Sequence, residues 1–93
     1  MESIMKRKIE FILRNYSPEA QTVKAIEELA ELQAELAKLL NKQGGHDALV
    51  SEMADVYIMM TQLMVIFDID TEEFDIEIDG KLDRQIWRIE EGR

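Results

Sequence analysis

The chain lacks cysteine, which excludes disulfides and thiolate metal sites. It also lacks tandem repeats and low-complexity linkers, and its 93 residues suit one domain, spanning 1–93, with a single core. No apolar run approaches the length of a membrane span, and residues 1–15 contain no secretory hydrophobic region. We therefore expect one soluble, cytoplasmic domain that does not enter a membrane.

Basic residues are scarce. Eleven lysines and arginines stand against 20 acidic residues, which gives a net charge of −9. Such a balance repels polyanions and argues against binding to long DNA or RNA. It suits a protein that gathers divalent cations, although most acidic surfaces only confer solubility.

Apolar residues recur at helical spacing through most of the chain and predict an all-α fold of four helices. Ser17 and Pro18 form a helix start, with serine as the cap and proline at the first helical position. Gly44-Gly45 is typical of a helix end and a turn. The predicted helices cover about residues 3–16, 18–42, 47–67 and 71–91.

The last segment also admits another structure. Phe74, Ile76 and Ile78 alternate with acidic residues, and Asp79-Gly80 is a hairpin-turn dipeptide, so a β-hairpin is the alternative. We favour helix because apolar residues from Phe74 to Ile89 repeat every three or four positions. Gly80 would then mark a kink, or a break between two shorter helices.

The third predicted helix carries carboxylates in an unfavourable setting. Apolar residues from Met53 to Phe67 point in nearly every direction, which predicts a helix buried on all sides. Glu52 and Asp55 share one face of this helix. An ionised carboxylate in such surroundings is costly unless it is paired or bound to metal, and no lysine or arginine lies between residues 42 and 81.

The second helix carries a matching pair. Glu28 and Glu31 have the same spacing as Glu52 and Asp55, and the Gly44-Gly45 turn should make the two helices antiparallel. Counting from the turn leaves the pairs offset by about one to two helical turns, which the helix crossing must absorb. Four carboxylates form an all-oxygen site that suits Mg²⁺ or Mn²⁺ and argues against zinc.

The ordered motif E-E-L-A-E (27–31), then twenty residues, then E-M-A-D (52–55) resembles a family signature. It is similar to the EExxE…ExxD motif of the MazG-like all-α nucleoside triphosphate pyrophosphohydrolases. The similarity covers about residues 17–88, including the apolar run, the FDID turn and Lys81. It implies an oligomeric four-helix MazG-like bundle. The implied reaction is hydrolysis between the α and β phosphates, which gives a monophosphate and pyrophosphate.

The resemblance also implies roles for individual residues. Glu28, Glu31, Glu52 and Asp55 would hold Mg²⁺, or Mn²⁺, and would serve in catalysis together with Glu27. Glu27 lies off the main arc of the helix, so it either orients a water or metal ligand or faces solvent.

The family also places a lysine and a nearby arginine on the substrate's phosphates. Lys81, Arg84 and Arg88 share one helical face here and are the candidate substrate-binding residues. The residue four positions after Lys81 is Gln85, so whether Arg84 or Arg88 would bind phosphate stays open. The alternative that all three residues only face solvent also stays open. Lys24 is expected to pair with Glu28 within its helix rather than to bind phosphate.

Two other functions stay open. Phosphoribosyl-ATP pyrophosphohydrolase has a related fold and motif, but this chain has Ile58-Met59 where that enzyme typically shows Tyr-His. A non-catalytic helical dimerisation module fits the apolar third helix and leaves Glu52 and Asp55 unexplained. In each case we expect a homodimer or homotetramer, because a helix apolar on every side needs more neighbours than one chain of four helices supplies.

Overall fold

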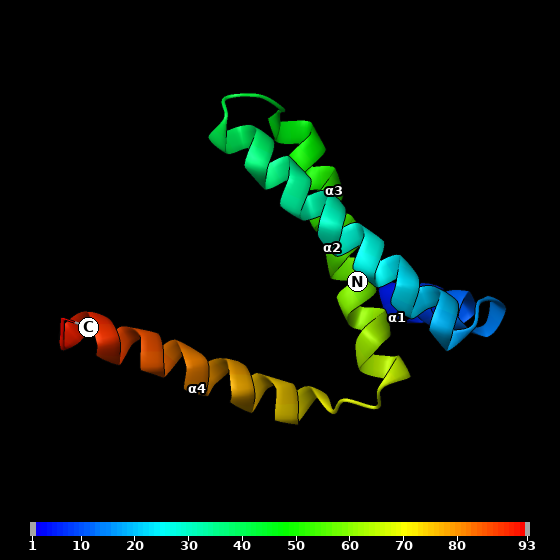
Figure 1. Ribbon diagram of the computed structural model, residues 1–93. Coiled ribbons are helices and arrows are strands. Elements are labelled where there is room, and N and C mark those ends of the chain that lie inside the picture. Colours follow the sequence, from blue (N-terminus) through cyan, green and yellow to red (C-terminus); the bar gives the residue numbers. More distant parts are fainter. Residues whose placement is uncertain (1, 93) are drawn as a thin grey trace.

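The computed structural model describes residues 2–92, which form four α-helices and no strand (Figure 1). This confirms the all-α prediction, and each helix end lies within two residues of its expected position. The helices are α1 (Glu2–Asn15), α2 (Pro18–Leu40), α3 (His46–Ile66) and α4 (Thr71–Glu90).

The start of α2 and the turn after it follow from local chemistry. The Ser17 hydroxyl accepts a hydrogen bond from the Ala20 amide at 3.1 Å, and Pro18 follows as predicted. After α2, Gly44 adopts a φ of +75°, and a Cβ there would lie 3.3 Å from Cβ of Lys38. This position requires glycine, and the turn that it forms sends α3 back along α2.

The last segment is one continuous helix. α4 runs unbroken through Gly80, which confirms helix for this segment, and the alternatives of a β-hairpin and of a break into two helices are both wrong. The Glu73 carboxylate accepts a hydrogen bond from the Asp70 amide at 3.3 Å, which supports the helix start. This cap lies just before the acidic alternation that suggested a strand.

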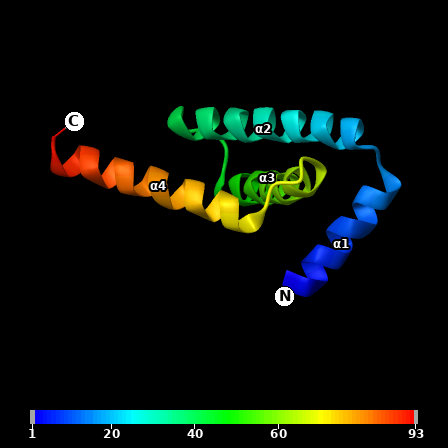
Figure 2. The ribbon, with the colours of Figure 1, turned by 90° about the horizontal axis from the view of Figure 1, so that it is seen from below.

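The four helices do not close into a bundle within one chain. α2 and α3 form an antiparallel pair, α1 contacts α3, and α4 projects away from the others (Figures 1 and 2). The Cα radius of gyration is 16.3 Å, whereas a compact chain of this length has a value of about 12 Å. The single chain is therefore an open structure.

Little of the apolar surface is buried in this open structure. Only Ile9, Ala25 and Met59 are buried apolar residues among those described. On α3, Tyr57 is 60% exposed and Val65 is 58% exposed. The expectation that α3 is buried on every side is therefore wrong for the single chain.

α3 also has the length and apolar composition of a membrane-spanning helix, alone among the described helices. This corrects the expectation that no run approaches that length. Length and composition are weak evidence here, because the core helix of a soluble protein passes the same test. Moreover, α3 carries Glu52 and Asp55, and ionisable residues are costly inside a bilayer.

A buried amide pair joins α2 to α3. The Gln21 side chain donates a hydrogen bond from Nε2 to Oε1 of Gln62 at 2.7 Å. Gln62 is 2% exposed and Gln21 is 9% exposed. Since water does not reach these amides freely, each depends on the other for hydrogen bonding.

We expect Gln21→Leu to lower the free energy of unfolding by about 1–3 kcal/mol, because it leaves the Gln62 amide buried without its partner. The double variant with Gln62→Leu should recover part of that loss, since two apolar side chains replace two polar ones. Urea unfolding followed by circular dichroism measures both. Equal losses in the single and double variants would contradict the pairing.

Candidate metal centre

Three carboxylates from α2 and α3 converge in the structure. Glu28, Glu31 and Glu52 each place one oxygen so that all three oxygens lie within 4.8 Å of one another. Glu28 is buried, Glu52 is half-buried and Glu31 is exposed. The antiparallel crossing of the two helices absorbs the offset counted from the sequence. A single cation between the helices could reach all three oxygens.

Two of these carboxylates have an unsatisfied oxygen. Oε2 of Glu28 and Oε2 of Glu52 are buried, and neither has a hydrogen-bond partner among the described residues. A buried carboxylate oxygen without a partner costs free energy, which a bound cation would offset. The donor set contains oxygen alone, which is the set that Mg²⁺, Mn²⁺ and Ca²⁺ accept. The residues present therefore fit a divalent cation.

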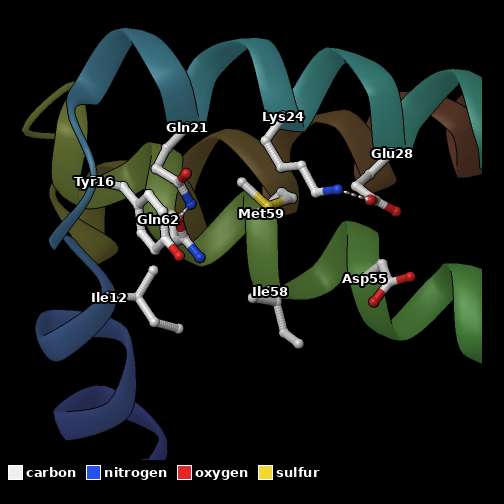
Figure 3. A pocket seen from close by; sticks show the side chains of 9 residues that line it. All are labelled: Ile12, Tyr16, Gln21, Lys24, Glu28, Asp55, Ile58, Met59 and Gln62. Carbon is white, nitrogen blue, oxygen red and sulfur yellow. Dashed lines mark hydrogen bonds and ion pairs between the residues drawn. The ribbon is translucent and has the colours of Figure 1, made fainter.

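The other two motif residues lie outside this cluster. Asp55 is half-buried and lines a pocket together with Glu28 (Figure 3), but it is not among the three clustered carboxylates. Glu27 is exposed and also lies outside the cluster. The structure thus brings together three of the four predicted metal ligands and places the fourth beside them. The role of Glu27 stays a prediction.

The environment of Glu52 favours its protonated form. Burial is the largest factor that raises the pKa of Glu52, and the negative charges of Glu31, Glu28 and Asp55 raise it further. Three neighbouring carboxylates therefore repel its ionised form. A divalent cation would reverse this preference, because it stabilises the ionised carboxylates.

This gives a prediction for the metal-free protein. The folded state holds the Glu52 proton more tightly than the unfolded state does, so this group stabilises the fold below its ordinary pKa of 4.5. That contribution is lost as the pH rises from 4.5 through the raised pKa of the folded state. Glu52→Gln cannot ionise, so we expect it to be more stable than the unsubstituted protein at pH 7 in chelator.

The measurement is urea unfolding in chelator, for both proteins, from pH 4 to pH 8, a range of about four units around the titration. The stability difference should grow in favour of Glu52→Gln as the pH rises. A difference that is constant across the range would contradict the assignment.

Glu28 also forms an ion pair with a lysine. Nζ of Lys24 lies 3.2 Å from Oε1 of Glu28, which confirms the expected pairing within the helix. The hydrogen bond with Glu28 and the charge of that carboxylate raise the pKa of Lys24. The ammonium is therefore charged at neutral pH. It contacts one oxygen of Glu28, and the other is the unsatisfied one.

A pocket of about 520 Å³ extends from this ion pair between α1, α2 and α3 (Figure 3). Glu28 and Asp55 line one end, and the amides of Gln21 and Gln62 line the other. The remaining lining residues are Ile12, Tyr16, Lys24, Ile58 and Met59. A role for Gln62 was not predicted from the sequence. As the one amide within the apolar run of α3, it was a signal for a buried polar contact.

The three candidate phosphate-binding residues lie elsewhere. Lys81, Arg84 and Arg88 are exposed on α4, which projects away from α2 and α3, the helices that carry the clustered carboxylates (Figure 1). Nζ of Lys81 lies 3.7 Å from Oε1 of Glu77 on the same helix. Within one chain, therefore, the structure does not bring these basic residues to the carboxylate cluster.

Comparison of the chain with protein families, curated proteins and solved structures finds no match. The resemblance to the MazG-like family therefore rests on the EExxE…ExxD motif alone.

Proposed function

We propose that this protein is a Mg²⁺-dependent nucleoside triphosphate pyrophosphohydrolase of the MazG-like kind. Its substrate would be a ribo- or deoxyribonucleoside triphosphate, cleaved with water to a monophosphate and pyrophosphate. The convergence of Glu28, Glu31 and Glu52, with two buried oxygens that lack partners, supports this proposal. These are also three of the acidic positions of the motif.

Residues of this chain would provide the metal ligands and the substrate pocket that this reaction needs. Glu28, Glu31, Glu52 and Asp55 would hold Mg²⁺, with Mn²⁺ as the second choice. A divalent cation held there would neutralise charge on the phosphates and activate water for attack on phosphorus. The adjoining pocket has a volume of about 520 Å³, within the range of roughly 300–1,000 Å³ of small-molecule sites.

The active form would be a homodimer or homotetramer located in the cytoplasm. α4 has no buried residue, although it carries an apolar stripe that includes Ile78 and Leu82. A second copy would cover such surfaces and complete the helical bundle that one chain leaves open. It would also offer a route by which the basic face of α4 reaches a carboxylate cluster.

The deciding experiment is a phosphate-release screen against the common and modified nucleoside triphosphates and phosphoribosyl-ATP. The proposal expects pyrophosphate as the product with at least one nucleoside triphosphate, and no activity in chelator. Activity confined to phosphoribosyl-ATP would support the phosphoribosyl-ATP pyrophosphohydrolase alternative instead. Release of orthophosphate alone would contradict cleavage between the α and β phosphates.

The exposed apolar surface favours a second candidate, a non-catalytic helical dimerisation module. Such a module uses α3 and α4 and needs no metal. Calorimetric titration with Mg²⁺ or Mn²⁺ separates the two candidates, because saturable binding that disappears in Glu28→Gln is expected only of the metal-dependent enzyme.

We expect replacement of Lys81, Arg84 and Arg88 with alanine to raise KM or lower kcat, with a combined loss in kcat/KM of about tenfold or more. The physical reason is the loss of cations that offset the substrate's negative charge. Lys6→Ala with Lys8→Ala and Arg14→Ala, on exposed positions of α1, is the control for the same change in net charge. Unchanged kinetics in the triple variant would indicate that these residues only face solvent and do not bind substrate.

A further inference from the structure

The pocket contains a cation of its own. Among the described residues that line it, Lys24 is the only basic one. We propose that Lys24 is an exchangeable counter-ion. Its ammonium neutralises Glu28 while the carboxylate cluster is free of metal, and it binds a phosphate group in the pocket once a divalent cation occupies the cluster. This inference rests on the proposed metal site and deepens the proposed function.

The ion pair is built so that the lysine can leave it. The Lys24 side chain is 52% exposed, whereas that of Glu28 is only 7% exposed. The buried carboxylate is therefore fixed, and the flexible lysine reaches it from the solvent side. A lysine head carries three N–H donors on a four-carbon stem, so the ammonium can turn from one acceptor to another without moving the helix.

A cation in the cluster changes what the ammonium faces. Without metal, Lys24 faces Glu28, with Glu31 and Glu52 close behind it. The buried Oε2 of Glu28 has no partner and is the oxygen available to a metal. A divalent cation there offsets two of the three negative charges of the ionised cluster, which weakens its attraction for the ammonium, and the cation itself repels the ammonium. The nearest space open to the ammonium is the pocket, since Lys24 and Glu28 both line it.

The chemistry of the pocket indicates a phosphate group as the new acceptor. Lys24 lies along α2 between the amide of Gln21 and the carboxylate of Glu28 (Figure 3). An anion at this place would lie between two cations, the ammonium and the metal. A phosphate group has several oxygens and can contact both at once. The other candidate cations, on α4, project away from this pocket within the chain.

The structure supplies a matched control. Nζ of Lys38 lies 3.2 Å from Oε1 of Glu35, the same separation as in the Lys24–Glu28 pair. Lys38 is 53% exposed, also close to the value for Lys24, and it does not line the pocket. Both lysines lie on α2. Lys38→Met therefore removes an equivalent charge and ion pair outside the pocket.

The test measures binding by calorimetry in the full chain, with no turnover required. The probes are Mg²⁺ alone and inorganic pyrophosphate at saturating Mg²⁺. We expect Lys24→Met to bind Mg²⁺ at least as tightly as the unsubstituted protein, because a competing cation is gone. Its pyrophosphate affinity should fall by about tenfold or more, the loss of one charge-assisted contact. Lys24→Arg should retain most of that affinity, and Lys38→Met should change neither.

Three results would overturn the inference. One is weaker Mg²⁺ binding with unchanged pyrophosphate affinity in Lys24→Met, which would make the lysine a structural partner of Glu28 only. Another is an equal loss in Lys38→Met, which would indicate a net-charge effect. Absence of Mg²⁺ binding in the unsubstituted protein would overturn both this inference and the proposed function.

The inference and the proposed function fail in distinguishable ways. If pyrophosphate binding depends on Lys24 but no triphosphate is hydrolysed, the role of Lys24 is supported and the proposed enzymatic activity is contradicted. If the protein hydrolyses a triphosphate but Lys24→Met binds pyrophosphate with normal affinity, the enzymatic activity is supported and the role of Lys24 is contradicted. If Lys24→Met fails to fold, Lys24→Gln with the same two probes applies the same criteria.

Discussion

Glu28→Gln should abolish saturable Mg²⁺ binding and reduce triphosphate hydrolysis by about a hundredfold or more. The reason is that Glu28 would bind the metal ion directly in the proposed site. Glu28 is the buried member of the cluster, and one of its oxygens has no partner. The substitution keeps the side-chain volume and removes the charge. We therefore expect the fold to survive, with circular dichroism close to that of the unsubstituted protein.

Two comparisons sharpen this experiment. Glu35→Gln lies on the same helix, outside the cluster and the pocket, and should leave hydrolysis unchanged. Asp55→Asn should abolish turnover with the fold largely preserved, because Asp55 faces the pocket beside Glu28. Full activity in either Glu28→Gln or Asp55→Asn, or hydrolysis that chelator does not inhibit, would refute the metal-dependent mechanism.

Sedimentation at low micromolar concentration should show an assembly of at least two 10.8 kDa chains. The reason is the amount of apolar surface that one chain leaves exposed. Phe67 is 59% exposed, and α4 contributes no buried residue. Soluble monomers rarely expose apolar surface on this scale, and a two-fold contact between copies would bury it.

Charged substitutions on the exposed apolar surface also test whether the protein is an oligomer. Met60→Asp with Phe67→Asp should dissociate the assembly and lower its thermal stability, because it would place carboxylates in a buried apolar interface. On a genuine monomer these exposed positions would tolerate the change, at a cost within about 0.5 kcal/mol each. Gln33→Asp, at an exposed polar position of α2, is the control. A clean monomer that hydrolyses triphosphates would refute the oligomer.

The helices and their limits were predictable because local chemistry sets them. Apolar spacing defined each segment, and Ser17 and Pro18 started α2. The helix ends at Leu40, and Gly44 lies in the turn that follows. The last segment was the exception. Phe74 and Ile78, two of its alternating apolar residues, also fit a helical period, and the continuous helix through Gly80 excludes the hairpin.

The sequence placed Glu28, Glu31, Glu52 and Asp55 as two pairs on two helices, since three-residue spacing determines a shared helical face. It did not determine their distances, because those depend on how α2 and α3 cross. Tertiary structure decided that Glu28, Glu31 and Glu52 converge, that Asp55 lies beside them, and that Gln62 meets Gln21. It also decided that α4 carries its basic face away from the cluster, because no residue of α4 is buried against the rest of the chain.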